Sequence, residues 1–89
     1  MTAKRFIISG RVQGVGYRYF ACRAAGTCGV AGTVRNLPDG TVEAVAEGEP
    51  SAVAAFRAEL ERGPRYGHVE RVAEEPAPVA GHSDFRVVY

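Results

Sequence analysis

"SGRVQGVGYRYFACRAAG", residues 9–26, is the stretch that decides the fold. It begins in a segment with strand character, passes through the loop Gln13–Gly16, and then has helical character from Tyr17 to about Ala25. Gly26 is expected to end that helix, because glycine readily adopts the left-handed conformation that closes many helices. The glycines alone leave two interpretations open: a loop that binds an anion, or only a tight turn.

Hydrophobic periodicity and turn residues predict the remaining elements. The sequence Leu37-Pro38-Asp39-Gly40 is a strong turn signal, since proline fixes φ and glycine is free to take a positive φ. The expected strands cover residues 4–12, 28–36, 41–47, 68–74 and 85–89, and the second helix runs from about Pro50 to Gly63-Pro64.

The predicted order is β-α-β-β-α-β with one more short strand. It indicates an α/β (α+β) protein with a ferredoxin-like sandwich. We expect a mostly antiparallel sheet, two helices on one face, and a short C-terminal strand. The 89 residues are enough for a single domain, residues 1–89, and too few for two.

Alternation within the strands assigns their faces. In the second strand, Val30, Gly32 and Val34 fall on one side. In the third strand, Glu43 and Glu47 are expected on the exposed side.

Charge is distributed unevenly along the chain. Residues 1–38 hold six lysines and arginines and no acid, whereas residues 39–89 hold five arginines and all ten acids. A one-signed region favours an anionic partner such as a phosphate, a carboxylate or nucleic acid. Arginines that only solvate exposed faces would give the same pattern, and charge alone does not separate the two explanations.

The cysteines and histidines match no redox or metal motif. Cys22 and Cys28 are six positions apart, about 9 Å along a continuous helix and too far for a disulfide. That objection weakens if the helix ends at Gly26. We expect reduced, largely buried thiols. His68 and His82 have no third ligand near them, so we expect surface residues and no metal site.

The chain has no apolar run near the 18 residues that a membrane helix needs. The apolar run at its start is too short for a signal peptide. A cytoplasmic protein without a membrane partner is therefore expected, and we expect a monomer.

The loop has the composition of an anion site. Gly14 and Gly16 allow successive N–H groups to converge, and the following helix adds its free N-terminal donors. Arg18 adds a forked donor that matches phosphate geometry. Nucleotide motifs fail, because a GxGxxG from Gly14 meets Tyr19, and a P-loop from Gly10 meets glycine where lysine is required.

Topology predicts that a second polar residue lies near this loop. If the first helix is a crossover, the first and second strands run parallel and end at one edge of the sheet. Asn36 closes the second strand there and offers both a donor and an acceptor. Two structural interpretations stay open at this point: Asn36 as a turn-initiating residue, and Arg18 as a solvated helix residue.

Three segments carry a family resemblance. "GRVQGVGYR" (residues 10–18), "GTVRNLPDGTVE" (residues 32–43) and the pattern of Phe56, Leu60 and Gly63-Pro64 resemble the acylphosphatases, in order and over essentially the whole chain. The resemblance implies a small ferredoxin-like enzyme that hydrolyses the carboxyl–phosphate bond of small acyl phosphates. It implies no metal and no cofactor.

The resemblance also implies the site residues. Arg18 matches the phosphate-binding arginine of the family, and Asn36 matches the asparagine that positions the attacking water, so both are expected to be catalytic. The backbone N–H groups of one segment are expected to cradle the phosphate: Gln13, Gly14, Val15, Gly16, Tyr17 and Arg18.

Three residues depart from the family pattern. Tyr17 replaces a common phenylalanine, Thr33 a frequent large aromatic residue, and Cys28 a usual leucine. We expect these departures to alter packing near the second strand rather than the reaction.

The chemistry fits the residues at hand. Residues 1–38 contain no His, Asp or Glu, and an activated acyl phosphate does not require a strong general base, since a phosphate oxygen can accept the proton of the water. A non-catalytic phosphate-binding module on the same fold is the main alternative. An RNA-binding domain with this strand order needs aromatic residues on its central strands. The strand at 41–47 has none and carries two carboxylates, so no nucleic-acid partner is expected.

Overall fold

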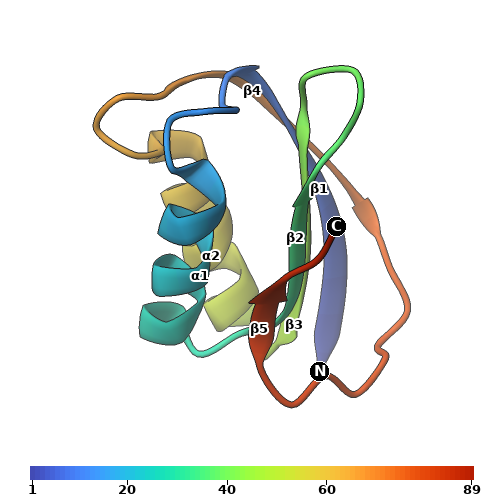
Figure 1. Cartoon of the computed structure of the whole chain (residues 1–89). Helices are drawn as coiled ribbons and strands as arrows, with labels where there is room; N and C mark the ends of the chain where they lie inside the picture. Colours follow the sequence, from blue (N-terminus) through green and yellow to red (C-terminus); the bar gives the residue numbers. More distant parts are fainter.

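The structure is a computed structural model and describes all of residues 1–89. It consists of one sheet with two helices packed on one of its faces (Figure 1). No helix combines the length and apolar character needed to cross a membrane. The elements in chain order are β1 (Thr2–Arg11), α1 (Tyr17–Cys28), β2 (Ala31–Asn36), β3 (Val42–Gly48), α2 (Pro50–Arg62), β4 (His68–Pro76) and β5 (Phe85–Val87).

The sheet order is β4-β1-β3-β2-β5, which confirms the predicted ferredoxin-like arrangement. β3 pairs antiparallel with both β1 and β2, and β5 pairs parallel with β2. β1 and β2 therefore run in the same direction on either side of β3. Ile8 and Asn36 both pair with Val42, so the carboxyl ends of these two strands lie at one edge of the sheet. Figure 1 shows the loop after β1 and the β2–β3 hairpin at that same edge.

The core lies between the sheet and the helices. Phe56 of α2 contacts two aromatic rings edge-on, with centroids 6.3 Å away at Phe6 and 5.3 Å away at Phe85. Fully burying a side chain of this size contributes roughly 1.5–3 kcal/mol. The other large or medium buried side chains are Ile8, Val12, Tyr17, Val30, Val34, Val42, Val53 and Leu60.

The predicted end of α1 at Gly26 was wrong. The helix continues to Cys28 and ends at Gly29, whose φ of 79° is left-handed and whose N–H donates to the Ala25 carbonyl at 2.9 Å. Val30 N–H donates to the same carbonyl at 3.1 Å. A helix end at Gly29 therefore gives the Ala25 carbonyl, which lies in the last turn, its hydrogen-bond donors.

The later helix end also moves the cysteines. Cys28, expected in the second strand, is instead the last residue of α1, and β2 begins only at Ala31. Both Cys22 and Cys28 are free thiols and half-buried rather than largely buried. Neither histidine is buried, as predicted.

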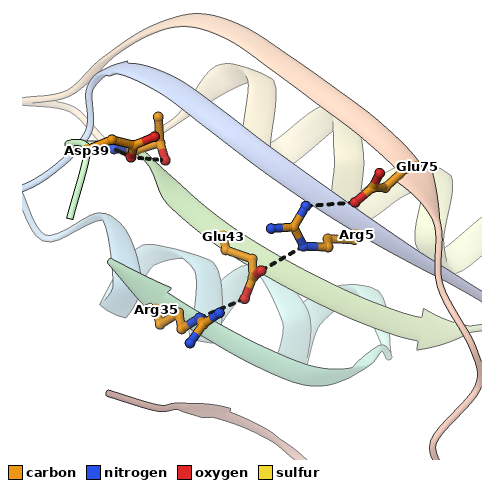
Figure 2. Close-up of polar contacts among 6 residues, drawn as sticks. Arg5, Arg35, Asp39, Glu43 and Glu75 are labelled. Carbon is orange, nitrogen blue, oxygen red and sulfur yellow. Dashed lines mark hydrogen bonds and ion pairs between the residues drawn. The ribbon is translucent and has the colours of Figure 1, made fainter. Parts of the chain in front are cut away.

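The prediction that Glu43 is exposed was also wrong. It lies on the sheet face opposite the helices, as alternation indicates, but arginines from both neighbouring strands cover it (Figure 2). Arg5 Nε donates to one of its oxygens at 2.7 Å and Arg35 Nε to the other at 2.8 Å. Burial pushes the pKa of Glu43 upward, but the two guanidinium groups outweigh it and hold the pKa below its ordinary value. Arg5 continues the network to Glu75 at 2.7 Å.

Glu47 was likewise expected to be exposed and is buried. Its carboxylate accepts hydrogen bonds from the backbone N–H groups of Ala80, Gly81 and His82, at 3.0, 2.9 and 3.1 Å. These bonds, led by the one from Ala80, keep the pKa of Glu47 below its ordinary value against the cost of burial. Glu47 therefore holds the connection between β4 and β5 against the sheet.

We expect Glu47→Gln to unfold at a lower temperature than the wild type at pH 7. Because the pKa in the folded state lies below the ordinary value of 4.5, the carboxylate stabilises the fold above that value. The stabilisation is lost as the pH falls through the folded-state pKa, so the two melting temperatures should converge in acid. Glu70→Gln, which changes an exposed carboxylate of β4, is the control for thermal unfolding followed by circular dichroism. A difference that stays constant from pH 7 to pH 3 would contradict this assignment.

The corrected helix end predicts opposite effects for two glycines. Gly26 lies inside α1 without a positive φ, so Gly26→Ala should raise the free energy of unfolding by about 0.5–1 kcal/mol. Gly29 is left-handed, so Gly29→Ala should lower it by about 1–2 kcal/mol. A Cβ would meet nothing within 4 Å at either position, which leaves backbone conformation as the cause. Urea unfolding measures both changes, and stabilisation by Gly29→Ala would contradict the observed helix end.

Candidate active site

The loop between β1 and α1 leaves its backbone donors unused. Gly14 and Gly16 both adopt left-handed φ values, 74° and 79°, and Gly16 is the N-cap of α1 without a side-chain cap. Phe20 N–H donates to the Gly16 carbonyl at 3.0 Å and starts the helical ladder. The N–H groups from Gln13 to Tyr19 donate to no other group of the chain. Such a run of free donors at a helix N-terminus is suited to an anion.

A cavity of about 290 Å³ opens in front of this loop. It combines loop backbone with side chains from α1, from the end of β2 and from the segment around β5, and no Asp, Glu or His side chain lines it. Its lining residues are Val12, Gly14, Gly16, Tyr17, Arg18, Tyr19, Cys22, Asn36, Val87 and Tyr89.

Arg18 is the cationic side chain of this cavity. It is in the first turn of α1 and takes part in none of the ion pairs of the chain. Its guanidinium carbon lies 5.6 Å from the centre of the Tyr89 ring, a cation–π contact that leaves the N–H groups in the guanidinium plane available. Arg18 can therefore pair with an anion in the cavity without first breaking an internal ion pair.

Asn36 reaches the same cavity from β2, as the parallel course of β1 and β2 predicts. It is the last residue of the strand and alternates with Gly32 and Val34 on the face that the helices cover. Its Oδ1 atom is buried and has no hydrogen-bond partner. Leaving a buried amide oxygen without a hydrogen-bond partner costs free energy. A water or ligand bound in the cavity would donate a hydrogen bond to this oxygen and remove that cost.

Gln13 and Val15 do not line the cavity with their side chains. Gln13 Nε2 donates to the carbonyls of Leu37 and Thr41, both at 2.9 Å, and so joins the loop to the β2–β3 hairpin. Val15 packs against the hydrophobic core. The sequence indicates the loop but not the Gln13 contact, since its partners are backbone atoms of a distant segment.

Tyr17 anchors the start of α1. Its ring is buried, and its hydroxyl donates to the Leu60 carbonyl at 2.7 Å. Leu60 lies in the last turn of α2, where carbonyls have no helical partner, so this departure from phenylalanine supplies a hydrogen bond between the helices.

Cys22 lines the cavity but is poorly suited to act as a nucleophile. Burial raises the pKa of the Cys22 thiol, which keeps it protonated near neutral pH.

A second, larger cavity of about 490 Å³ lies between α1 and α2. Arg62 at its rim pairs with Glu59, and Arg23 lies with them, so charges of both signs line it. It contains neither Arg18 nor Asn36. The chain also has no group of three or more His, Cys, Asp or Glu side chains placed to hold a metal ion. The smaller cavity is therefore the candidate active site.

Fold and cavity together define a small ferredoxin-like protein with a glycine-rich loop that faces a site suited to an anion. Comparison with known proteins identifies its family. The sequence model of the acylphosphatase family matches residues 4–87. The acylphosphatase of Pasteurella multocida is 47% identical, with the whole of both chains covered. That of Solibacter usitatus is 46% identical over 96% of this chain and 88% of its own. The crystal structure of acylphosphatase from Bacillus subtilis superimposes with a TM-score of 0.97 over 100% of both chains, at 38% identity.

The chain belongs to the acylphosphatase family and is an enzyme of that class. The resemblance carried by the three sequence segments is thereby confirmed.

We expect Tyr17→Phe to lower the free energy of unfolding by about 1–2 kcal/mol, because it leaves the buried Leu60 carbonyl without a partner. Urea unfolding at pH 7 measures the change. Tyr66→Phe removes an exposed hydroxyl and is the matched control, expected to alter stability by less than about 0.5 kcal/mol. Equal effects of the two substitutions would show that the Tyr17 hydroxyl does not hold the helices together.

Proposed function

We propose that this enzyme hydrolyses the carboxyl–phosphate bond of small acyl phosphates at the cavity in front of the β1–α1 loop. One observation carries the proposal: the free loop donors, the unpaired guanidinium of Arg18 and the unpaired amide oxygen of Asn36 face one cavity without an Asp, Glu or His side chain. Membership of the acylphosphatase family supports the reaction class.

The loop and Arg18 bind the phosphoryl group in this mechanism. The N–H groups of Gln13, Gly14, Val15, Gly16, Tyr17 and Arg18 surround its oxygens, and the positive end of α1 adds to the attraction. The Arg18 guanidinium donates to two phosphoryl oxygens. During phosphoryl transfer the charge spreads over the non-bridging oxygens, and preorganised donors stabilise that charge without reorganising.

Asn36 holds the attacking water. Its buried Oδ1 accepts a hydrogen bond from the water and orients a lone pair toward phosphorus. The water oxygen forms a bond to phosphorus, and the bond from phosphorus to the acyl oxygen breaks with its electrons going to the departing carboxylate. A phosphoryl oxygen accepts the proton that the water loses, so the products are a carboxylate and dihydrogen phosphate, which can then release a proton to solvent. No side-chain base is required, in keeping with the lining of the cavity.

The proposal also covers the domain organisation, the oligomeric state and the cellular compartment. Residues 1–89 act as a single domain and as a monomer in the cytoplasm. The two free thiols support a reducing compartment, because oxidising ones favour disulfides. Two of the large exposed apolar side chains, Tyr19 and Tyr89, line the candidate active site itself. Light scattering during size exclusion would measure the mass directly.

Hydrolysis of benzoyl phosphate by the wild type, Arg18→Ala and Asn36→Ala tests the mechanism. Each substitution should lower kcat/KM by at least about 100-fold, because each removes a group aligned with the reacting phosphoryl group or water. Arg18→Ala should also raise the inhibition constant of inorganic phosphate, whereas Asn36→Ala should leave it nearly unchanged.

Arg23→Ala is the matched control, since Arg23 is also on α1 and also without an ion pair but lies outside this cavity. It should keep wild-type activity. Full activity in folded Arg18→Ala and Asn36→Ala would refute the site assignment. A folded wild type that binds phosphate without hydrolysing the substrate would instead support the phosphate-binding module.

A further inference from the structure

The Gln13 side chain forms hydrogen bonds that the proposed binding of phosphate does not require. The proposed phosphate cradle uses its backbone N–H, yet its side chain turns away from the cavity and binds the β2–β3 hairpin. Both bonds are 2.9 Å long and join residues 24 and 28 positions apart in the chain.

Two carbonyl acceptors determine the chemistry of this contact. Neither Leu37 O nor Thr41 O can donate, so the partner must supply two hydrogens from one position. The amide NH₂ group of glutamine has two such hydrogens, and its orientation is set by the acceptors. Aspartate, glutamate or a hydroxyl residue at position 13 could not satisfy both carbonyls.

The hairpin that Gln13 holds is the one that carries Asn36. Leu37 directly follows Asn36, and its N–H donates to the Thr41 carbonyl at 2.9 Å, so both Gln13 acceptors belong to the closing pair of the turn. The loop donors and Asn36 lie on segments separated by the whole of α1. Gln13 is the side chain that bonds these two segments directly to each other.

We infer that Gln13 is a positioning residue, whose side chain fixes the distance between the phosphate-binding loop and Asn36 and thereby places the attacking water in line with the phosphoryl group. The inference rests on the proposed function of Asn36. Gly14, Gly16 and the packed Val15 shape the loop without this contact, so phosphate binding does not depend on it. The contact governs the chemical step instead, because small errors in the placement of a reacting group are costly.

A double-mutant cycle with Gln13→Met and Asn36→Ala tests the inference on benzoyl phosphate. Methionine keeps the length and volume of glutamine but donates nothing. We expect Gln13→Met to lower kcat by at least about 10-fold and to change the inhibition constant of inorganic phosphate by less than about threefold. In the Asn36→Ala background the same substitution should alter kcat by less than about twofold, because the residue on which it acts is gone.

Thr41→Val is the control for the hairpin. It removes the hydroxyl that donates to Asp39 but keeps the backbone carbonyl that accepts from Gln13, so kcat should stay at the wild-type level. If Gln13→Met fails to fold, as judged by circular dichroism, Gln13→Ala takes its place. Three results would overturn the inference: an unchanged kcat in the folded variant, an equal loss in both backgrounds, or a loss of phosphate affinity in proportion to kcat.

A readout without catalysis separates this inference from the proposed function. The side-chain NH₂ resonances of Asn36, assigned by comparison with Asn36→Ala and recorded with saturating inorganic phosphate, should shift or broaden in Gln13→Met and stay in place in Thr41→Val. An inactive wild type would defeat the proposed hydrolysis but leave this experiment able to decide whether Gln13 positions Asn36. Unchanged resonances in Gln13→Met would overturn the inference whatever the activity.

Discussion

A loop that offers its backbone donors to a ligand cannot use them to hold its own shape. The N–H groups from Gln13 to Tyr19 are all unpaired within the chain: those of the first turn of α1 are free as in any helix, and those of the loop extend the run. The shape is kept by other means: left-handed glycines, the partly buried Val15, and, at the start of the helix, the Tyr17 hydroxyl that donates to the Leu60 carbonyl. Gln13 and Tyr17 flank the glycine-rich turn and reach opposite neighbours, the β2–β3 hairpin and the end of α2. The loop is therefore held by contacts on the side away from the cavity, and its N–H groups stay free toward the cavity.

The sheet also explains the uneven charge of the chain. Lys4, Arg5 and Arg35 come from the acid-free first part, but each pairs with a carboxylate from the second part, on strands that lie beside them. Much of the sequence asymmetry therefore disappears on folding. Arg18 is an exception that faces the candidate active site, where no Asp or Glu side chain lines the cavity. The local absence of acids around Arg18, more than the total charge of residues 1–38, makes the cavity suitable for an anion.

The sequence predicted the elements whose signals are local and missed those that depend on distant partners. Alternation and turn residues indicate the strands, and the crossover rule predicts that Asn36 lies close to the loop. Gly26 and Gly29 are equally able to end a helix, and the choice depends on which carbonyls the following chain can satisfy. Glu43 is covered by arginines from separate strands, and Gln13 binds backbone atoms beyond α1, so neither contact has a local signature.

The two outer strands of the sheet affect whether the protein associates with other chains. An open sheet presents unpaired backbone groups along its borders, which can template association with another chain. One border here, β5, is only three residues long. The other, β4, exposes Glu70, Arg71, Glu74 and Glu75 and ends in Pro76. Exposed charges and a terminal proline without an N–H are among the features by which natural sheets discourage pairing along an edge strand. Glu74 and Glu75, which pair with Lys4 and Arg5 of β1, thus also contribute to the charged border of the sheet.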